Sequence, residues 1–492
     1  MSEQQQAHPT TTESELIAVR RDKLAKIREL GIDPYGARFD VTTTPAGLKA
    51  DFQEDKQVAV AGRLLAIRDM GKSQFFVIGD VRGKIQGFLH KNEVDETTWK
   101  LWKLLDRGDW VGIRGTTFLT RTGEPTVKVS GLTILSKSLR PLPDKWHGLA
   151  DKEVTYRKRH LDLISNEESA SLFVTRSLMI AEIRRFLQER GYLEVETPML
   201  QDVAGGAAAK PFETYHNALD MPLTLRIAPE LFLKRLMVGG FTKIFELNRS
   251  FRNEGIDRRH NPEFTSIELY QAYADYHEIM DLVEEMYIYV TQKVCGTLKI
   301  QYQGKEINME GPWTRMTMAE SVKKYSGIDY YAWENDEQAR KECEARGVHV
   351  EANAVKGECL EACFDEFVEK NLIQPTFITD YPVAISPLAK RKKDEPDMTE
   401  RFEFFANCSE LGNAFSELND PIDQRKRFES QAAAKRAQGL HADVDEDYIC
   451  ALEYGMPPTG GLGFGVDRLV MLLTDSASIR DVLLFPTMKP LG

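Results

Sequence analysis

Two segments far apart in the chain, FRNEGIDRRHNPEF at 251–264 and GLGFGVDRL at 461–469, constrain the fold most. Alternation through the first segment predicts a strand end with Arg252 and Glu254 on one face, while neighbouring apolar residues point toward a core. The second segment predicts an apolar helix that follows a run of glycines and carries Arg468 in its first turn. Arginine binds phosphate bidentately and stacks on rings, so two fixed guanidiniums with an aromatic ring between them suit a triphosphate that carries a purine. The pattern therefore predicts an ATP site.

No other nucleotide motif competes with this interpretation. The chain has no Walker A loop, and the glycines of GLGFG lack the strand, turn and helix order that a dinucleotide-binding fingerprint requires. The glycines at 460, 461, 463 and 465 instead suit a backbone that passes close to a ligand.

The bulk composition predicts a soluble protein of several domains. A length of 492 residues exceeds one ordinary core, so we expect two or three domains. A hydrophobic fraction of 42% with 28% charged residues is typical of globular proteins. No apolar run reaches the length of a membrane span, and the start, MSEQQQAHPTTTESE, lacks the basic and apolar regions of a signal peptide. These features predict a cytoplasmic location.

The six cysteines form no CxxC pair and have no histidine partner at zinc-site spacing. We interpret them as reduced thiols rather than as a zinc site or a disulfide framework.

The net charge of −12 is unevenly distributed along the chain. Residues 1–140 carry 22 Lys and Arg against 18 Asp and Glu, or +4, and the rest carry 42 against 58, or −16. An electrostatic footprint for nucleic acid therefore falls on the amino-terminal part, although an excess of this size also fits ordinary solvated surface.

The first 54 residues predict a tail followed by one helix. Residues 1–12 are polar, and we expect them to be disordered. Residues 13–30 carry five basic side chains and predict a basic amphipathic helix that covers the next domain. Its apolar positions near helical spacing are Leu16, Val19, Leu24 and Ile27.

Residues 55–139 contain five short β-rich runs separated by glycine-containing turns. Strands this short and this closely spaced predict a small closed barrel of the oligonucleotide-binding (OB) type, which binds single-stranded bases by stacking on exposed aromatic rings. The next segment, residues 140–150, begins RPLPDKW and has no periodicity, so it predicts a linker.

The two ATP-site segments resemble motifs 2 and 3 of the class II aminoacyl-tRNA synthetases. Residues 141–164, 205–212 and 411–421 resemble in particular the bacterial lysyl-tRNA synthetases, and the resemblance extends over nearly the whole chain. It implies an α+β protein, with a five-stranded OB-type barrel that binds the anticodon. A catalytic domain at 151–492 would follow, built on an antiparallel sheet flanked by helices, with a helical insertion at about 317–372. The HIGH and KMSKS signatures of class I synthetases are absent.

The resemblance also implies a homodimer and an RNA partner. A helix at about 168–190 followed by YLEVETPML resembles motif 1, whose helix and strand form the class II dimer interface. The implied reaction activates L-lysine with ATP to lysyl-adenylate and joins it to the 3′ end of tRNA(Lys), which has a uridine-rich anticodon. The positions that match the anticodon site are Arg68, Phe75 and Gln86. Because Phe75 and Phe76 must point oppositely, core packing stays an open alternative for Phe75.

The family's ATP and magnesium residues can be carried over to this chain. Arg252 would bridge the substrate carboxylate and the α-phosphate, whereas Arg468 and Arg259 would hold the γ-phosphate. Catalysis would then be mostly the positioning and neutralisation of two anions that repel, with no general base. Glu403 and Glu410 are expected to coordinate Mg²⁺, which prefers oxygen ligands and few protein groups. The remaining ATP residues are Glu254, His260, Asn261, Gly465 and Phe264, which would stack beneath the adenine.

A lysine ammonium that leaves water needs carboxylates and a hydroxyl around it, or desolvation cancels the binding. Glu268 and Tyr270 share one strand face in FTSIELYQAY, and Asn413, Phe415 and Glu417 share one in NAFSE. Both faces open to one cavity if these strands flank each other in the sheet. In the family, Glu268, Glu417 and Tyr270 meet the side-chain ammonium, and Phe415 packs on the methylenes. Further lysine-binding positions are expected at or beside the α-amino and α-carboxyl groups of the substrate. They are Gly205, Gly206, Glu230, Asn413 and Gly463.

Three alternatives are open at this point. A synthetase for aspartate or asparagine shares the architecture, but its substrate needs a cation or amide donors, and Glu268 with Glu417 would repel aspartate. A lysine ligase that modifies an elongation factor resembles the catalytic half alone, so the barrel argues against it. A synthetase-like binding module without catalysis would be expected to lack one of the charged ATP-site residues, and Arg252, Glu403, Glu410 and Arg468 are all present.

Overall fold

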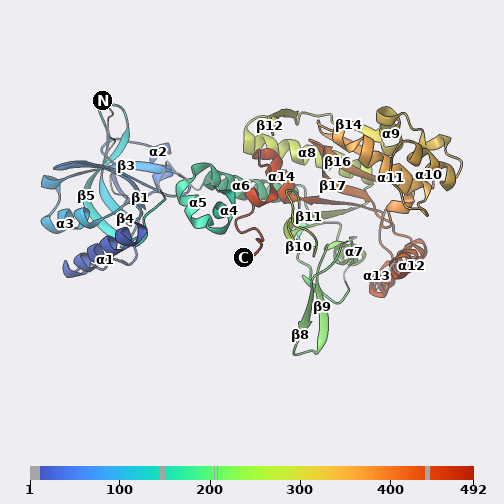
Figure 1. Ribbon diagram of the computed structural model, residues 1–492, viewed down its shortest axis with the longest axis horizontal. Helices are drawn as coiled ribbons and strands as arrows, with labels where there is room; N and C mark the ends of the chain where they lie inside the picture. Colours follow the sequence, from blue (N-terminus) through green and yellow to red (C-terminus); the bar gives the residue numbers. More distant parts are fainter. Residues whose placement is uncertain (1–11, 144–150, 204, 208, 438–443, 492) are drawn as a thin grey trace, which may run out of the picture. The chain divides into compact units, whose positions relative to one another are not determined.

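The computed structural model describes residues 12–143, 151–203, 205–207, 209–437 and 444–491 (Figure 1). The chain forms two compact units, Met1–Val174 and Thr175–Gly492. Most of the tail predicted at 1–12 and of the linker predicted at 140–150 lies outside the described residues. Within the ranges given above, every helix is too short or too polar to cross a bilayer.

A closed five-stranded barrel forms the core of the first unit. Its strand order is β1-β2-β3-β5-β4, and β4 pairs back to β1. Only β3 and β5 are parallel neighbours. The predicted OB-type barrel is therefore confirmed. Its strands are β1 (Gln57–Met70), β2 (Ser73–Gly79), β3 (Lys84–His90), β4 (Trp110–Leu119) and β5 (Pro125–Ser136), with α2 (Pro45–Ala50), η1 (Lys91–Glu93) and α3 (Glu96–Leu104) beside them.

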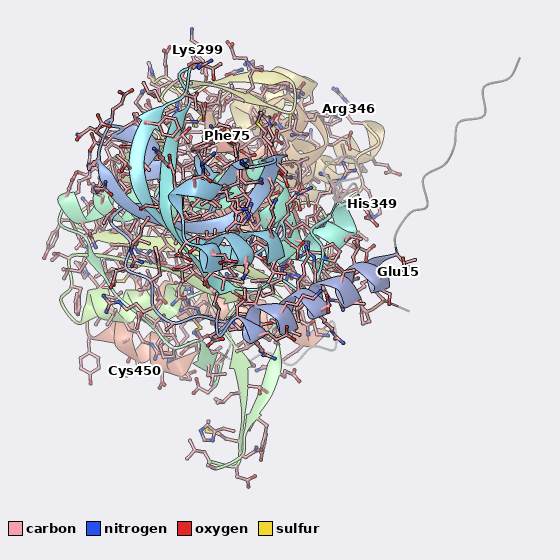
Figure 2. All side chains as sticks on the ribbon, turned by 90° about the vertical axis from the view of Figure 1, so that its left-hand side faces the viewer. Glu15, Phe75, Lys299, Arg346, His349 and Cys450 are labelled. Carbon is pink, nitrogen blue, oxygen red and sulfur yellow. The ribbon has the colours of Figure 1, made fainter. Side chains whose placement is uncertain are left out.

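Alternation along β2 decides which aromatic ring faces outward. Phe76 is 2% exposed and packs in the barrel core, where its ring centroid lies 4.7 Å from that of Trp102. Because successive side chains of a strand point to opposite faces, Phe75 projects from the outer surface of the barrel (Figure 2). The alternative that places Phe75 in the core is excluded.

Helix α1 (Glu13–Glu29) is present as predicted, but its apolar face is only partly right. Ile27 is fully buried, whereas Leu16 and Val19 are 37% and 51% exposed. Arg20, which directly follows Val19 in the helix, points inward instead and is 8% exposed. A buried arginine therefore breaks the predicted amphipathic pattern. Its guanidinium donates hydrogen bonds to the backbone carbonyls of Arg107, Ser138 and Arg140.

An eight-stranded sheet forms the centre of the second unit (Figure 1). Its order is β14-β15-β16-β17-β18-β11-β10-β6, and only the two outermost pairs are parallel. The predicted antiparallel sheet is thus confirmed in its six central strands. The strands are β6 (Leu193–Glu194), β10 (Lys243–Phe251), β11 (Glu263–Ala272), β14 (Thr314–Thr317), β15 (Thr376–Thr379), β16 (Arg401–Ala406), β17 (Ser409–Ser416) and β18 (Thr459–Gly465). Two smaller sheets contain β7 (Leu200–Gln201), β8 (Glu213–His216) and β9 (Met221–Leu225), and β12 (Lys299–Tyr302) and β13 (Lys305–Asn308).

Helix α8 (Tyr276–Cys295) covers one face of this sheet. Tyr287 of α8 contacts Phe404 of β16 and Phe464 of β18, with ring centroids 5.2 and 5.5 Å apart. The strand residues that alternate with these phenylalanines point the other way. The opposite face is therefore free to form the cavity described below. Further helices outside the 317–372 segment are α4 (Lys152–Arg157), α5 (Arg159–Ser165), α6 (Glu167–Glu189), α7 (Glu230–Val238), α12 (Pro421–Ala437), α13 (Glu446–Glu453), α14 (Val466–Leu473) and α15 (Ile479–Val482).

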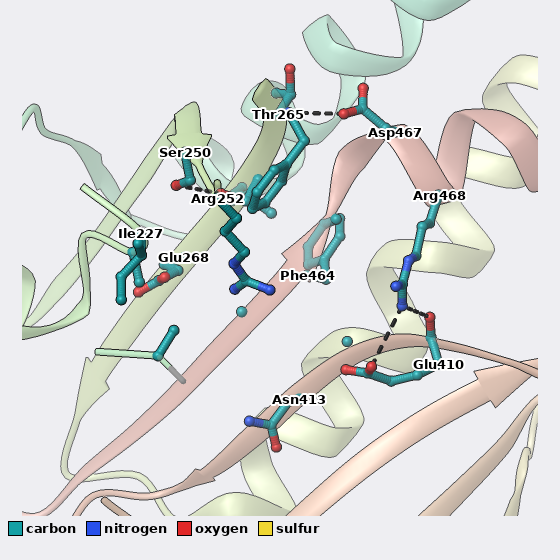
Figure 3. Close-up of a pocket in the computed structure, with 18 of the residues that line it drawn as sticks. Ile227, Ser250, Arg252, Thr265, Glu268, Glu410, Asn413, Phe464, Asp467 and Arg468 are labelled. Atoms are coloured by element: carbon teal, nitrogen blue, oxygen red, sulfur yellow. Dashed lines mark hydrogen bonds and ion pairs between the residues drawn. The ribbon is translucent and has the colours of Figure 1, made fainter. Parts of the chain in front are cut away.

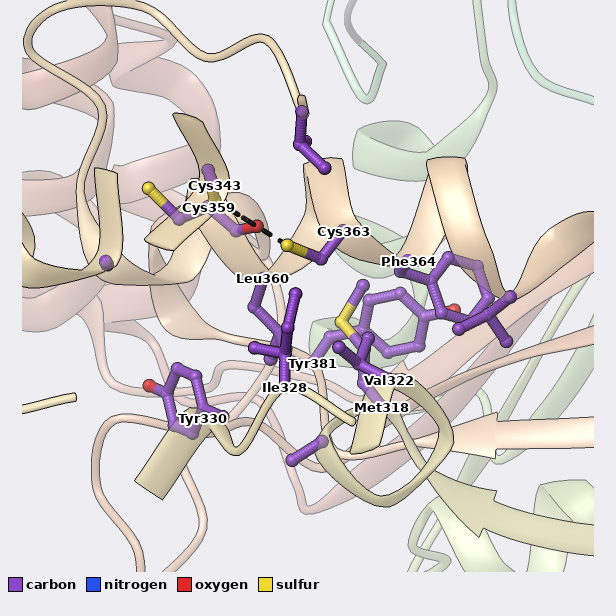
Figure 4. Packing of buried hydrophobic residues seen from close by; sticks show 14 of the residues in the cluster. Met318, Val322, Ile328, Tyr330, Cys343, Cys359, Leu360, Cys363, Phe364 and Tyr381 are labelled. Carbon is purple, nitrogen blue, oxygen red and sulfur yellow. Dashed lines mark hydrogen bonds between the residues drawn. The ribbon is translucent and has the colours of Figure 1, made fainter. Parts of the chain in front are cut away.

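The segment at 317–372 is mainly helical, as its pattern predicts. Three of the free cysteines, Cys343, Cys359 and Cys363, lie in its hydrophobic core (Figure 4). The Sγ atoms of Cys343 and Cys363 are 3.6 Å apart. The helices are α9 (Met318–Ser326), η2 (Tyr330–Ala332), α10 (Asp336–Ala345), α11 (Lys356–Phe367) and η3 (Glu369–Asn371), and η4 (Val383–Ile385) follows β15.

Candidate active site

A cavity of about 420 Å³ lies on the sheet face opposite α8. It is lined from β10, β11, β17, β18, α7 and α14, which come from widely separated parts of the sequence. Two predicted residues line adjoining cavities instead, Gly205 in one of about 310 Å³ and Glu403 in one of about 250 Å³. The predicted residues that line the main cavity are Gly206, Glu230, Arg252, Glu254, Arg259, His260, Asn261, Phe264, Glu268, Tyr270, Glu410, Asn413, Phe415, Glu417, Gly463, Gly465 and Arg468.

Arg252 follows the last residue of β10 and extends into this cavity (Figure 3). Its backbone N–H donates to the carbonyl of Pro262 at 2.8 Å, which closes the base of the turn between β10 and β11. The guanidinium carbon lies 5.1 Å from the Phe264 ring centroid, and the Nε atom is buried without a hydrogen-bond partner. Burial lowers the pKa of Arg252. A guanidinium whose Nε atom is buried and unpartnered is suited to receive an anion.

Arg468 enters the same cavity from the first turn of α14 (Figure 3). Its Nη1 donates to the backbone carbonyl of Glu410 at 2.6 Å and lies 3.5 Å from the Glu410 carboxylate. The start of α14 is fixed by Asp467, which accepts from the backbone N–H of Thr265 at 2.8 Å and pairs with Arg176 at 2.6 Å. The predicted position of Arg468 in the helix is confirmed.

Besides Arg252, the turn between β10 and β11 presents four more of the predicted ATP residues, three of them exposed. His260 bonds to the Asp257 carboxylate at 2.8 Å, and Arg259 lies 3.7 Å from Glu369 of η3. Asn261 is buried and donates to a backbone carbonyl of β11 at 2.7 Å. The fourth residue, Glu254, is exposed at the cavity rim.

The acidic end of the cavity contains Glu230, Glu268 and Glu417. The Tyr270 hydroxyl donates to Glu268 at 3.0 Å. Glu417 is 1% exposed, and its Oε1 atom has no hydrogen-bond partner. Burial raises the pKa of Glu268 and of Glu417 to about 8. These carboxylates therefore bind a proton more tightly than exposed ones, and they would favour a cationic ligand that replaces it.

The strands that carry these groups do not flank each other, contrary to the arrangement considered from the sequence. β18 lies between β11 and β17, so that Glu268 is opposite Gly463 and Gly463 is opposite Asn413. The two faces still share one cavity because glycines occupy the intervening positions. A Cβ at Gly461 would lie 2.0 Å from the Glu417 carboxylate and 2.8 Å from the Tyr270 ring. The glycine run is thus a strand, and Gly461 leaves room for the two neighbouring side chains.

Gly463 and Gly465 differ from Gly461. A Cβ at either position would make ordinary contacts, 3.5 Å from Glu268 at Gly463 and 3.7 Å from Arg468 at Gly465. Gly206 has a φ of +85°, which favours glycine, and a Cβ there would lie 3.0 Å from Glu230.

Asn413 is held by Arg401, whose Nε donates to the Asn413 side-chain oxygen at 2.9 Å. Arg401 also donates to Glu403 at 2.6 Å, and the Tyr381 hydroxyl donates to the other Glu403 oxygen at 3.0 Å. Burial raises the pKa of Glu403 to about 7, and the nearby Glu410 carboxylate adds to this. Two carboxylates that project from paired strands fit a Mg²⁺ ion that keeps most of its waters. The part of the chain that the structure describes contains no cluster of three or more His, Cys, Asp or Glu arranged as a complete metal cage.

Lys234 was not among the predicted site residues, and its side chain is completely buried at the acidic end of the cavity. Its Nζ lies 2.5 Å from a carboxylate oxygen of Glu230 and 2.5 Å from one of Glu417. The only signal in the sequence was its spacing, since Lys234 follows Glu230 by one helical turn in ELFLK.

The predicted anticodon residues lie together on the outer face of the barrel. Arg68 of β1 pairs with Phe75 of β2, and the Phe75 ring centroid is 4.8 Å from that of Phe88. The side-chain amide of Gln86 donates a hydrogen bond to the Thr126 hydroxyl at 2.9 Å. Phe88 was missed, although alternation from Gln86 places it on the same face of β3. It extends the aromatic surface to Phe118, 6.1 Å away.

Comparisons with known proteins cover nearly the whole chain. A family model described as tRNA synthetases class II (D, K and N) matches residues 151–489, and one described as an OB-fold nucleic acid binding domain matches residues 58–135.

Three of the similar proteins, all named lysine–tRNA ligase, are aligned over nearly the whole chain. Those of Carboxydothermus hydrogenoformans and Moorella thermoacetica are each 54% identical over 481 residues, 97% of this chain and 98% of the relative. That of Staphylococcus aureus is 52% identical over 484 residues, 96% of this chain and 98% of the relative. The chain therefore belongs to the class II tRNA synthetases, in the family of the lysine–tRNA ligases.

Proposed function

We propose that this protein activates L-lysine with ATP to form lysyl-adenylate and pyrophosphate, and then transfers the lysyl group to the 3′ end of tRNA(Lys). The observation that carries the proposal is a single cavity with half-buried Arg252 at one end and the carboxylates of Glu230, Glu268 and Glu417 at the other. The names of the relatives support the same amino acid.

At the ATP end, Arg252 would bind both the lysine carboxylate and the α-phosphate that it attacks. The two groups are anions, so a fixed guanidinium between them offsets their repulsion and orients them for the displacement. Arg468 and Arg259 would bind the γ-phosphate, and Phe264 would stack on the adenine. Glu254, His260, Asn261 and Gly465 would line the nucleotide. No general base is needed, because the lysine carboxylate attacks already ionised.

Glu403 and Glu410 would hold Mg²⁺, in keeping with the pairing of their strands and with the fit described above. When bound, the ion would neutralise phosphate charge. Arg468 contacts Glu410 directly, so the arginine and the two carboxylates would act on the same triphosphate.

At the acidic end, Glu268, Glu417 and Tyr270 would bind the side-chain ammonium of lysine, with Phe415 against its methylenes. Glu230 and Asn413 would bind the α-amino and α-carboxyl groups, beside Gly205, Gly206 and Gly463. An aspartate side chain would meet these carboxylates with the wrong charge, which disfavours a synthetase for aspartate.

We further propose that the barrel at 55–139 binds the uridine-rich anticodon through Arg68, Phe75 and Gln86. The tail and basic helix at 1–54 would precede it. The linker at 140–150 would lead to a catalytic domain at 151–492, with an insertion at about 317–372 and a homodimer interface at motif 1. We place the enzyme in the cytoplasm, where its substrates are found.

The test is ATP–pyrophosphate exchange with each of the twenty amino acids. We expect exchange with lysine, and transfer to tRNA(Lys) once the tRNA is added. Exchange with aspartate or asparagine and none with lysine would reject the assignment of the acidic end.

A further inference from the structure

The acidic end of the cavity contains a cation of its own. Lys234 is fully buried, and its Nζ bridges Glu230 and Glu417 at 2.5 Å each. Its Nζ also lies 5.2 Å from the ring centroid of Phe415, the residue proposed to pack on the substrate methylenes. The side chain of Lys234 therefore touches three residues of the proposed lysine pocket without lining the cavity itself.

The ion pairs of Lys234 change the net charge at the acidic end of the cavity. Glu230, Glu268 and Glu417 carry three negative charges when ionised, and Lys234 cancels one of them. Two negative charges remain, which equals the number of ammonium groups on lysine. Without Lys234, the cavity would hold three carboxylates for two ammonium groups, and one buried carboxylate would stay unpaired, which is costly.

The bridge also orients Glu417. One carboxylate oxygen lies next to Lys234, while the other, Oε1, is buried without a hydrogen-bond partner. A carboxylate held at one oxygen presents the other in a fixed direction, ready for a donor from the substrate. Lys234 therefore fixes both the charge and the geometry of the group expected to recognise the side-chain ammonium.

We propose that Lys234 is a positioning residue for lysine recognition, whose ammonium sets the charge of the pocket and aims Glu417 at the substrate. The proposal rests on the function proposed above and deepens it. Lys234 contacts Glu230 and Glu417 directly, and it also interacts electrostatically with Tyr448 and Glu268. Glu246 and Tyr270 act in turn on Glu268.

The titration of these groups supports the same role. Burial alone would lower the pKa of Lys234, but the carboxylates of Glu230 and Glu417 outweigh it and raise that pKa. In return, Lys234 lowers the pKa of Glu417 and of Glu268, which burial has raised. Removal of Lys234 should therefore move the ionisation of these carboxylates to still higher pH.

The experiment is Lys234→Met in the full-length enzyme, measured by pyrophosphate exchange over a range of pH. We expect the KM for lysine to rise by about 100-fold at neutral pH while the KM for ATP changes by less than about threefold. The acid limb of kcat/KM for lysine should also move to higher pH. An unchanged lysine KM in the folded variant, or equal losses for lysine and ATP with an unmoved acid limb, would overturn the proposal.

Lys137→Met is the matched control. Lys137 is also a fully buried lysine that bridges two carboxylates, Asp106 at 2.6 Å and Asp109 at 2.9 Å, but it lies in the barrel unit. The Lys137→Met variant should be less stable than the wild type but should keep the same KM for lysine. If Lys137→Met raises that KM as much as Lys234→Met does, the effect is one of general destabilisation and the proposal fails.

A second measurement decides the question even if Lys234→Met does not fold. In a crystal structure of the wild-type enzyme with lysine, Lys234 should still bridge Glu230 and Glu417, and the substrate ammonium should contact Oε1 of Glu417. A Glu417 carboxylate turned away from Lys234 would contradict the inference. Wild-type enzyme that exchanges aspartate but not lysine would instead refute the proposed function, so the two failures are distinguishable.

Discussion

At the scale of single residues, Arg252 and Glu268 mark the two ends of the cavity. The backbone N–H of Arg252 is bonded to the turn, and its guanidinium lies over the Phe264 ring with the Nε donor left free. Glu268 accepts a hydrogen bond from Tyr270 and lines the cavity together with the carboxylates of Glu230 and Glu417. One end is thus prepared for an anion and the other for a cation, which is the charge pattern of an amino acid bound next to a triphosphate.

Arg252→Ala should abolish adenylate formation, because the cavity would lose the guanidinium proposed to hold the carboxylate and the α-phosphate together. Pyrophosphate exchange measures this directly, and circular dichroism shows whether the variant is folded. Exchange at the wild-type rate in folded Arg252→Ala would remove Arg252 from the reaction.

Glu268→Gln should weaken lysine binding by about 2 kcal/mol or more, because a desolvated ammonium loses its charged partner. The substitution keeps the shape of the side chain and its contact with Tyr270. Calorimetric titration with lysine supplies the measurement, and an unchanged affinity would exclude Glu268 from the pocket.

The pH dependence of lysine use follows from the raised pKa values of Glu268 and Glu417, both about 8. Below that pH these carboxyls bind protons that lysine must displace, so kcat/KM for lysine should rise with pH up to about 8 and then level off. The kcat/KM for ATP at saturating lysine should lack this limb. A flat lysine profile between pH 6 and 8 would show that the carboxyls are already ionised in the empty enzyme.

At the scale of elements, β18 determines how the site is assembled. The alternation of β11 and β17 correctly predicted which side chains share a face, since alternation depends only on local geometry. The order of the strands depends on contacts between distant segments, and the glycine run indicated only a close backbone approach. The position of β18 between the two strands therefore could not be read from the sequence, nor could the burial of Arg20 and Lys234, whose partners come from remote segments.

Gly461→Ala should raise the KM for lysine by about tenfold, because the added Cβ would collide with Glu417 and Tyr270 and neither can move without repacking. Gly131→Ala is a suitable control, since Gly131 also lies in a strand and its Cβ would meet the nearest atom at 3.8 Å. Lysine-dependent pyrophosphate exchange compares the two. Equal KM values in both variants would show that the acidic end tolerates displacement of Glu417.

At the scale of the whole molecule, the two units divide the proposed work. The cavity and all its lining residues lie in the second unit, and the barrel presents Phe75, Phe88 and Phe118 on its own surface. Activation of lysine and recognition of the anticodon should therefore respond to different substitutions.

Phe75→Ala should leave pyrophosphate exchange unchanged and lower kcat/KM for charging of tRNA(Lys) by about tenfold or more, because a stacked base loses its aromatic partner. Aminoacylation assays with limiting tRNA measure the loss. If folded Phe75→Ala loses exchange as well, the separation of the two functions is mistaken.

The proposed homodimer is testable on exposed apolar residues near motif 1. Leu178, Leu193 and Leu200 are 45%, 57% and 49% exposed, and a partner subunit would cover them. Sedimentation should give twice the chain mass of 56.0 kDa for the wild type, and Leu178→Asp with Leu193→Asp should lower it. Leu119→Asp, at a residue of similar exposure in the barrel, should not. A monomeric wild type would refute the interface.

The bare backbone of β18 has a consequence for how this enzyme can change over time. At its glycines, β18 lines the cavity with main-chain atoms alone, and main-chain atoms are not changed by a side-chain substitution. A preference for a different amino acid would therefore have to arise from side chains of β11, β17 and α7, while the β18 backbone stays the same.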